Sequence, residues 1–316
     1  MLIIVVGLLS TAKASERSST TPRNYFAADL VNFISSKNIE RNVIYSPATI
    51  HGLLAMTYFG MGGNSAQSFR RGLYLDNADD TSIAAEYGKF MASIQAPYFR
   101  MAYRIYVNGA FKGSKVFNSI ASKYFKTQTK NMDYMQNKKY VTDLFNDWIS
   151  AETNDRVKGV VTLDDVAGNP SIFLVNAIYF KGIWRRSFDI IKHQYFWLNA
   201  NDKVSVDMMH SMPDRTLYGN WHDLDASGIQ LEYADSDLSM LIILPKQREG
   251  LSSLAEKLGS IDLNSLTSRM SHARIDIYLP KFKIEFNIEL SDVLSKVCWY
   301  RIEMRCSLLL EFLLYL

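Results

Sequence analysis

Cysteine is almost missing from this sequence. The 316 residues include two, Cys298 and Cys306, and both lie within the last 19 residues. A disulfide framework through the body of the chain is therefore excluded. A bridge between Cys298 and Cys306 is one possibility in an oxidising compartment, and two free or intermolecular thiols are the other.

The motifs of enzyme active sites are missing as well. The five histidines are scattered without metal-ligand spacing, and neither a Gly-x-Ser-x-Gly elbow nor a glycine-rich phosphate loop occurs. We therefore expect no catalytic residue, no metal and no cofactor, and we predict that the chain is not an enzyme.

An excess of charge of one sign is also lacking. The chain carries 35 basic and 32 acidic residues, a net charge of +3, which does not indicate a nucleic-acid partner. The apolar run at the start of the chain is far shorter than the roughly 20 residues that span a bilayer, so no membrane span is predicted.

The N-terminus has the pattern of a leader. A short apolar run is followed by Ala12-Lys13-Ala14, which has the small-x-small form of a signal-peptidase site. We predict a signal peptide over residues 1–14 and an extracellular, secreted protein. The alternatives are that these apolar residues form a buried first segment or a truncated start.

The rest of the chain predicts an α+β fold. Apolar residues at helical spacing dominate the first half, and strand-like runs separated by turns dominate the second, which favours large mixed or antiparallel sheets over alternating βαβ units. The expected helices are a first helix from Thr21-Pro22 and the ranges 50–59, 81–95, 114–126, 140–153, 251–259 and 262–270. The expected strands are 102–107, 172–180, 204–209, 230–233, 239–244 and 274–283.

Four motifs, in order along the chain, resemble those of the serpin family of serine protease inhibitors. The first is Asn-Val-Ile-Tyr-Ser-Pro-Ala-Thr-Ile at 42–50, and the most specific is Phe-Leu-Val-Asn-Ala-Ile-Tyr-Phe-Lys-Gly-Ile-Trp at 173–184. Ser-Met-Leu-Ile-Ile-Leu-Pro at 239–245 and Leu-Pro-Lys-Phe-Lys-Ile-Glu at 279–285 follow. The resemblance covers a serpin-like domain over residues 22–297.

The resemblance implies a mechanism and a set of positions. A serine protease cleaves an exposed loop of the inhibitor, and the loop then inserts into the central sheet as an extra strand. Ser46, Thr49 and Asn176 match polar positions of the shutter, where strands of that sheet part, and Trp184 matches the breach, where insertion begins. Their structural alternatives are a helix cap for Ser46, backbone hydrogen bonding for Asn176 and core packing for Trp184.

The sequence departs from the family after a short helix expected at 288–297. A strand of the main sheet, an acidic hinge, the reactive loop and closing strands should follow, but residues 298–316 form a divergent apolar tail. We therefore expect a fold that is incomplete at the C-terminus, with a central strand missing from the main sheet, and a chain that does not trap proteases. The alternative is a non-inhibitory binding module that a partner chain completes.

A glycosaminoglycan partner is not predicted. The segment that resembles the family's heparin-binding helix, 81–95, contains Lys89 as its single basic residue, and Asp133 and Asp143 interrupt the later lysines. These later lysines are Lys112, Lys115, Lys123, Lys126, Lys130, Lys138 and Lys139.

Overall fold

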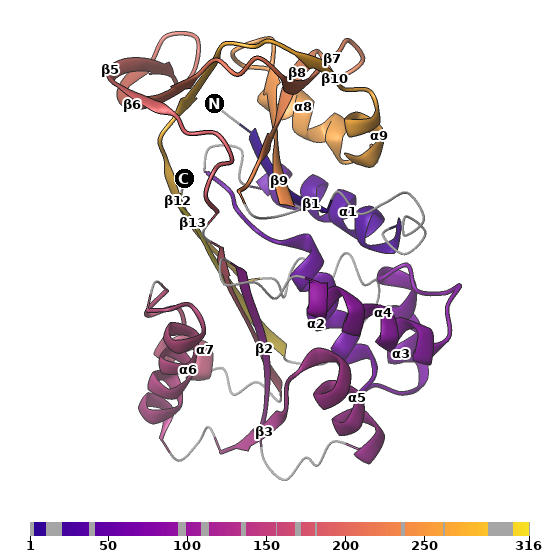
Figure 1. Cartoon of the computed structure of the whole chain (residues 1–316). Helices are drawn as coiled ribbons and strands as arrows, with labels where there is room; N and C mark the ends of the chain where they lie inside the picture. Colours follow the sequence, from indigo (N-terminus) through magenta and orange to yellow (C-terminus); the bar gives the residue numbers. More distant parts are fainter. Residues whose placement is uncertain are drawn as a thin grey trace.

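The fold is α+β, as the sequence predicts (Figure 1). The computed structural model describes residues 3–10, 21–37, 42–93, 99–108, 114–133, 137–155, 157–167, 172–180, 182–234, 238–261, 263–289 and 306–315. The helices are α1 (Thr21–Lys37), α2 (Pro47–Tyr58), α3 (Gly63–Gly72), α4 (Asp80–Ser93), α5 (Lys115–Phe125), α6 (Lys138–Glu152), α7 (Leu163–Ala167), α8 (Leu251–Leu258) and α9 (Leu263–Ser268).

The strands concentrate in the second half of the chain. They are β1 (Ile3–Ser10), β2 (Phe99–Asn108), β3 (Thr129–Met132), β4 (Ile172–Phe180), β5 (Asp189–Trp197), β6 (Lys203–Ser211), β7 (Thr216–Trp221), β8 (Ala226–Glu232), β9 (Leu238–Pro245), β10 (Ser271–Ala273), β11 (Ile277–Pro280), β12 (Lys283–Glu289) and β13 (Cys306–Tyr315).

A five-stranded sheet of order β12-β13-β4-β2-β3 forms the centre of the molecule. Successive residues of β4 point to opposite faces of this sheet. Leu174 is buried in a large core with residues of α2, whereas Phe173 and Val175 are buried against α6 on the other face. Figure 1 shows the sheet between α6 and α7 on one side and α2 to α5 on the other.

Helix α6 shows how a capping residue and an apolar stripe in the sequence produce a helix. Asn137 caps its first turn by accepting a hydrogen bond from the Tyr140 backbone N–H at 2.9 Å. Val141, Phe145 and Trp148 then recur on one face, and all three are buried against the sheet. The amphipathic stripe in the sequence thus predicts both the helix and the face that it buries.

The expectation of a missing central strand in this sheet is wrong. Residues of the apolar tail form β13, which is parallel to β4 and antiparallel to β12. Seven residue pairs join β13 to β12, from Lys283 with Tyr315 to Glu289 with Leu309. A strand with a partner on each side satisfies its backbone donors and acceptors, which a solvated apolar tail would not do as well. The tail therefore fills the gap that the departure from the family predicts.

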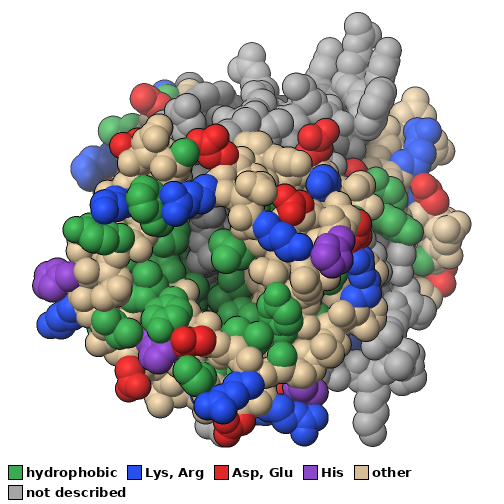
Figure 2. Space-filling view, turned by 90° about the horizontal axis from the view of Figure 1, so that it is seen from above, with side chains coloured by type: hydrophobic (Ala, Val, Ile, Leu, Met, Phe, Trp, Pro, Cys, Tyr) green, Lys and Arg blue, Asp and Glu red, His purple; other side chains and the backbone are tan. Residues whose placement is uncertain are grey.

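A second five-stranded sheet, of order β1-β9-β8-β7-β10, and a three-stranded sheet, of order β11-β6-β5, make up the other end of the molecule. Figure 2 looks down on this end, where hydrophobic side chains gather around a hollow. The expected strand 274–283 is divided in the structure between β11 and β12, and most of the expected helix 288–297 lies outside the described residues.

Over the described part of the chain, no helix combines the length and the apolar character that crossing a membrane requires.

Candidate functional site

Two of the predicted shutter residues lie at the start of α2. Ser46 is the N-cap residue, and its carbonyl accepts hydrogen bonds from the Ile50 backbone N–H at 3.1 Å and from Thr49 Oγ1 at 3.0 Å. The Ser46 side chain makes no capping bond. Thr49 is buried, so its hydroxyl needs the acceptor that the Ser46 carbonyl supplies.

Helix α2 approaches the central sheet closely. A Cβ atom on Gly52 would lie 2.5 Å from the Tyr103 hydroxyl oxygen of β2, so only glycine fits there without a shift of that ring. Tyr103 pairs in register with Asn176 of β4, and Asn176 in turn pairs with Leu310 of β13. Asn176 therefore lies in the middle of the sheet, although its side chain lies outside the described residues. Its partnership with Ser46 and Thr49 stays a prediction.

His51, also in α2, is a buried residue that the sequence analysis did not single out. Its Nε2 donates to the Leu73 carbonyl at 2.9 Å, and its Nδ1 accepts a hydrogen bond from the Tyr87 hydroxyl of α4. The Phe26 ring of α1 lies edge-on at 5.0 Å. Burial, with a smaller contribution from the positive charge of Arg23, lowers the pKa of His51 to about 4 despite the hydrogen bond to the Leu73 carbonyl. A neutral imidazole thus links α2 to α1, to α4 and to the residue that follows α3 inside the core.

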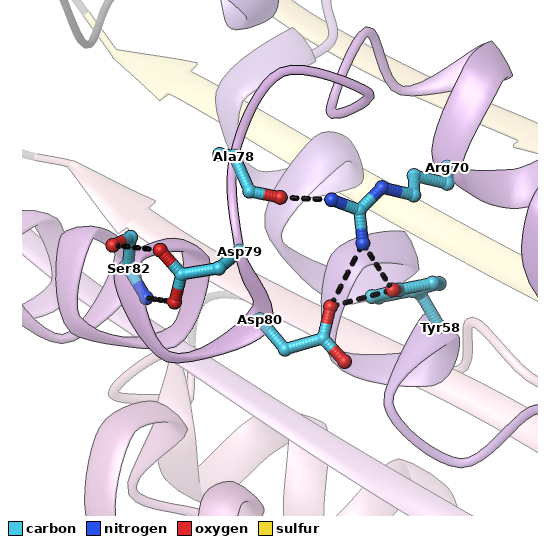
Figure 3. A network of polar contacts seen from close by, with 6 residues as sticks. All are labelled: Tyr58, Arg70, Ala78, Asp79, Asp80 and Ser82. Carbon is cyan, nitrogen blue, oxygen red and sulfur yellow. Dashed lines mark hydrogen bonds and ion pairs between the residues drawn. The ribbon is translucent and has the colours of Figure 1, made fainter.

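A polar network fixes α2 against α3 and α4 (Figure 3). Arg70 Nη1 donates to the Tyr58 hydroxyl at 2.9 Å and to Asp80 Oδ1 at 3.0 Å, while the Tyr58 hydroxyl donates to the same carboxylate oxygen at 2.7 Å. Asp79 caps α4 by accepting from Ser82 N at 3.0 Å and Ser82 Oγ at 2.6 Å. Hydrogen bonds as well as packing therefore fix the positions of α2, α3 and α4 relative to one another.

Trp184, the predicted breach residue, belongs to an aromatic cluster beyond the end of β4. Its ring stacks on Tyr233 with centroids 4.6 Å apart and an interplanar angle of 10°. Phe188 meets Trp184 edge-on at 6.1 Å, and Phe180 meets Tyr233 edge-on at 4.9 Å. Tyr233 is buried, which raises the pKa of its hydroxyl. We call Phe180, Trp184, Phe188 and Tyr233 the aromatic joint.

Backbone hydrogen bonds at the aromatic joint also connect two sheets. Trp184 and Tyr233 form an isolated antiparallel bridge, with hydrogen bonds from Arg185 N to Glu232 O at 2.9 Å and from Ala234 N to Ile183 O at 2.7 Å. Because β4 belongs to the central sheet and β8 to the second five-stranded sheet, the bridge couples the two. The segment after β4 is therefore joined to the end of β8 by backbone hydrogen bonds as well as by ring stacking.

Comparison with known proteins identifies the family. A family profile described as "Serpin (serine protease inhibitor)" matches residues 21–300. The chain belongs to the serpin family. Serine protease inhibitor 42Dd of Drosophila melanogaster is 33% identical over 276 residues, which are 85% of this chain and 72% of that protein. Human Serpin B3 is 29% identical over 280 residues, 82% of this chain and 72% of the relative.

Solved structures agree with the serpin assignment. The structure described as "Cleaved Serpin 42Da" superposes with a TM-score of 0.81 at 31% identity, and the match covers 87% of this chain and 75% of that one. A crystal structure of maspin superposes with a TM-score of 0.85 at 22% identity, covering 93% and 84%, which shows the fold alone. The family description names protease inhibitors and no enzyme, which agrees with the expectation of a non-enzyme as far as the family shows it.

The described residues contain no candidate metal centre. Within the described ranges no three histidine, cysteine, aspartate or glutamate side chains gather as a metal would require. Cys306 begins β13, and Cys298 lies outside the described residues, so their pairing stays open.

Substitution of Gly182 tests the aromatic joint. A Cβ at this position would collide with the rings of Tyr233 and Phe180, so Gly182→Ala should lower the free energy of unfolding by about 1–3 kcal/mol through overpacking. Urea denaturation measures the change. Ile183→Ala, at an adjacent and exposed position, is the control and should change stability by less than about 0.5 kcal/mol. Equal effects of the two substitutions would contradict the packing argument.

The lowered pKa of buried His51 predicts that the free energy of unfolding falls in acid. The folded chain holds His51 neutral with a pKa of about 4, whereas an unfolded chain protonates it near 6.5, so stability is complete above pH 6.5 and declines as the pH falls towards 4. The loss should reach on the order of 3 kcal/mol. His51→Gln removes the titrating group and should flatten the profile between pH 6.5 and 4 in urea denaturation. The exposed control His222→Gln should keep the parent slope, and a His51→Gln profile as steep as the parent's would refute the assignment.

Proposed function

We propose that this chain is a secreted serpin-family protein that does not trap proteases by loop insertion. The observation that carries the proposal is the identity of β13, the strand between β12 and β4. In the family mechanism, the strand at this place in the sheet leads into an acidic hinge and a run of small residues. The hinge and these residues enter the sheet after cleavage.

The strand in this protein has a different composition. β13 reads Cys-Ser-Leu-Leu-Leu-Glu-Phe-Leu-Leu-Tyr, and it pairs with β4 from Cys306 to Leu314. Such a leucine-rich strand favours a fixed place inside the sheet, and residues 298–316 contain neither the acidic hinge nor the run of small residues that the family mechanism inserts after cleavage. The geometry thus supports a serpin body whose central sheet is closed by its own tail.

The proposal also assigns a leader over residues 1–14 and an extracellular location, on the strength of the apolar run and the Ala12-Lys13-Ala14 site. A serine protease is the expected partner class for the family. For this chain we propose that such a protease cleaves or ignores the protein without becoming trapped. The filled sheet weighs against the alternative of a body that needs a partner chain to supply its central strand.

Incubation with trypsin, chymotrypsin and elastase, followed by SDS gel electrophoresis, tests the absence of trapping. We expect no SDS-stable adduct with any of the three and no change in the kcat/KM of the proteases towards small substrates. The Drosophila relative named as a serine protease inhibitor, produced in the same way, provides a comparison for the assay. An SDS-stable adduct of this chain with any protease would overturn the proposal.

A further inference from the structure

Strand β9 has the burial of an interior strand. Six of its eight residues are buried. Met240 and Ile242 lie in the large core that α2 shares, whereas Leu241 and Ile243 lie in a separate core with Leu254 of α8. A strand buried on both faces reads as a continuous apolar run and normally has a strand on each side.

Two edge strands differ from β9: β10, at the far edge of the same sheet, and β5, at the edge of the three-stranded sheet. β10 has three residues, none of them buried, and β5 is exposed over most of its length. β5 also has a register shift between Ile191 and Gln194, and His193 there has a positive φ of 58°. Short length, exposure and bulges are the devices that keep an edge from pairing with other chains. β9 shows none of them, so its outer edge is built to be covered.

The cover in this structure is β1. Its sequence, Ile-Ile-Val-Val-Gly-Leu-Leu-Ser, is apolar, and it runs antiparallel to β9 with Ile3 opposite Ile243 and Leu9 opposite Ser239. The register shifts between Val5 and Leu9, the stretch that contains a glycine. The pairing gives the outer edge of β9 a strand partner, as its buried, apolar sequence favours.

We propose that the outer edge of β9 is an acceptor site for an apolar β-strand, and that residues 3–10 of this same chain occupy it for as long as they remain attached. The residues predicted to form a leader are thus also a complementary strand for the folded body. Removal of residues 1–14 would leave the edge open to another apolar strand. The inference is independent of whether the protein traps proteases.

The fold favours this chain's own segment over a second copy. α1 packs against α8, and α8 shares a core with β9, so α1 begins close to the sheet that β1 completes. Ten residues separate Ser10 from Thr21 along the chain. A covalent connection of about this length gives the attached segment an effective concentration in the millimolar range, far above that of a second chain in dilute solution.

Paired cysteines test the site in the full chain. Directly opposed residues in an antiparallel pair have Cα atoms about 4.5–5.5 Å apart, within the range of a disulfide. In a Cys298→Ser, Cys306→Ser background, Ile4→Cys combined with Ile242→Cys should form an intramolecular disulfide on mild oxidation, because these positions are paired. The protein is made in a reducing cytoplasm, and intact mass verifies that residues 1–14 are present.

An off-register pair is the matched control. Ile4→Cys with Ile243→Cys moves one thiol to the other face of β9 and should bridge at least fivefold less. A second matched pair, Leu9→Cys with Ser239→Cys, keeps the test valid where the buried Ile242→Cys variant fails to fold.

Three results would overturn the proposal: no bridge in either matched pair, equal bridging of matched and off-register pairs, or a bridge that joins two chains. The last result would make a second copy the occupant of the β9 edge. A failure of the proposed function would appear as a protease adduct and would leave the pattern of bridging unchanged.

Discussion

The parallel pairing of β13 with β4 is the interaction on which the rest of this serpin depends. Without it, β4 would present an unpaired edge in the middle of the molecule, and β12 would have no partner within the described sheet. With it, five strands form a continuous layer that gives α2 and α6 surfaces on which to bury their apolar faces. A leucine-rich segment is suited to that place because an interior strand is covered on both faces.

The contacts around β4 explain how this layer is connected to the rest of the body. On one face α2 approaches closely enough that Gly52 has no room for a side chain, and buried His51 joins α2 to α4. Beyond the end of β4, the Trp184 and Tyr233 rings stack while their backbones pair, which couples the central sheet to β8. The family resemblance predicts that strands separate near Ser46 and Thr49, at the start of α2, and near Trp184. In this chain both sets of contacts hold together a sheet whose central place is taken by the tail.

The sequence predicted those elements whose signal is local and periodic. The stripe on α6 and the run Ile172–Phe180 of β4 are examples, because burial on one face of a helix or both faces of a strand leaves a pattern. α3 escaped prediction because Phe69 is its one buried residue, and β5 because it is exposed and bulged. The place of β13 depends on pairing with β4, more than a hundred residues earlier in the chain, as well as with β12. The composition of the tail does not say which strands it pairs with or in which register. The His51 contacts likewise involve residues 22 and 36 positions distant.

Hydrogen exchange of the backbone amides in Cys306–Tyr315 is the most direct measure of the central claim. If the tail is an interior strand, peptides that cover it should exchange as slowly as those of β4, and Leu310→Pro, which removes a ladder hydrogen bond, should accelerate exchange in both. If the tail amides exchange within seconds while β4 remains protected, β13 is not a member of the sheet and this account of the protein is contradicted.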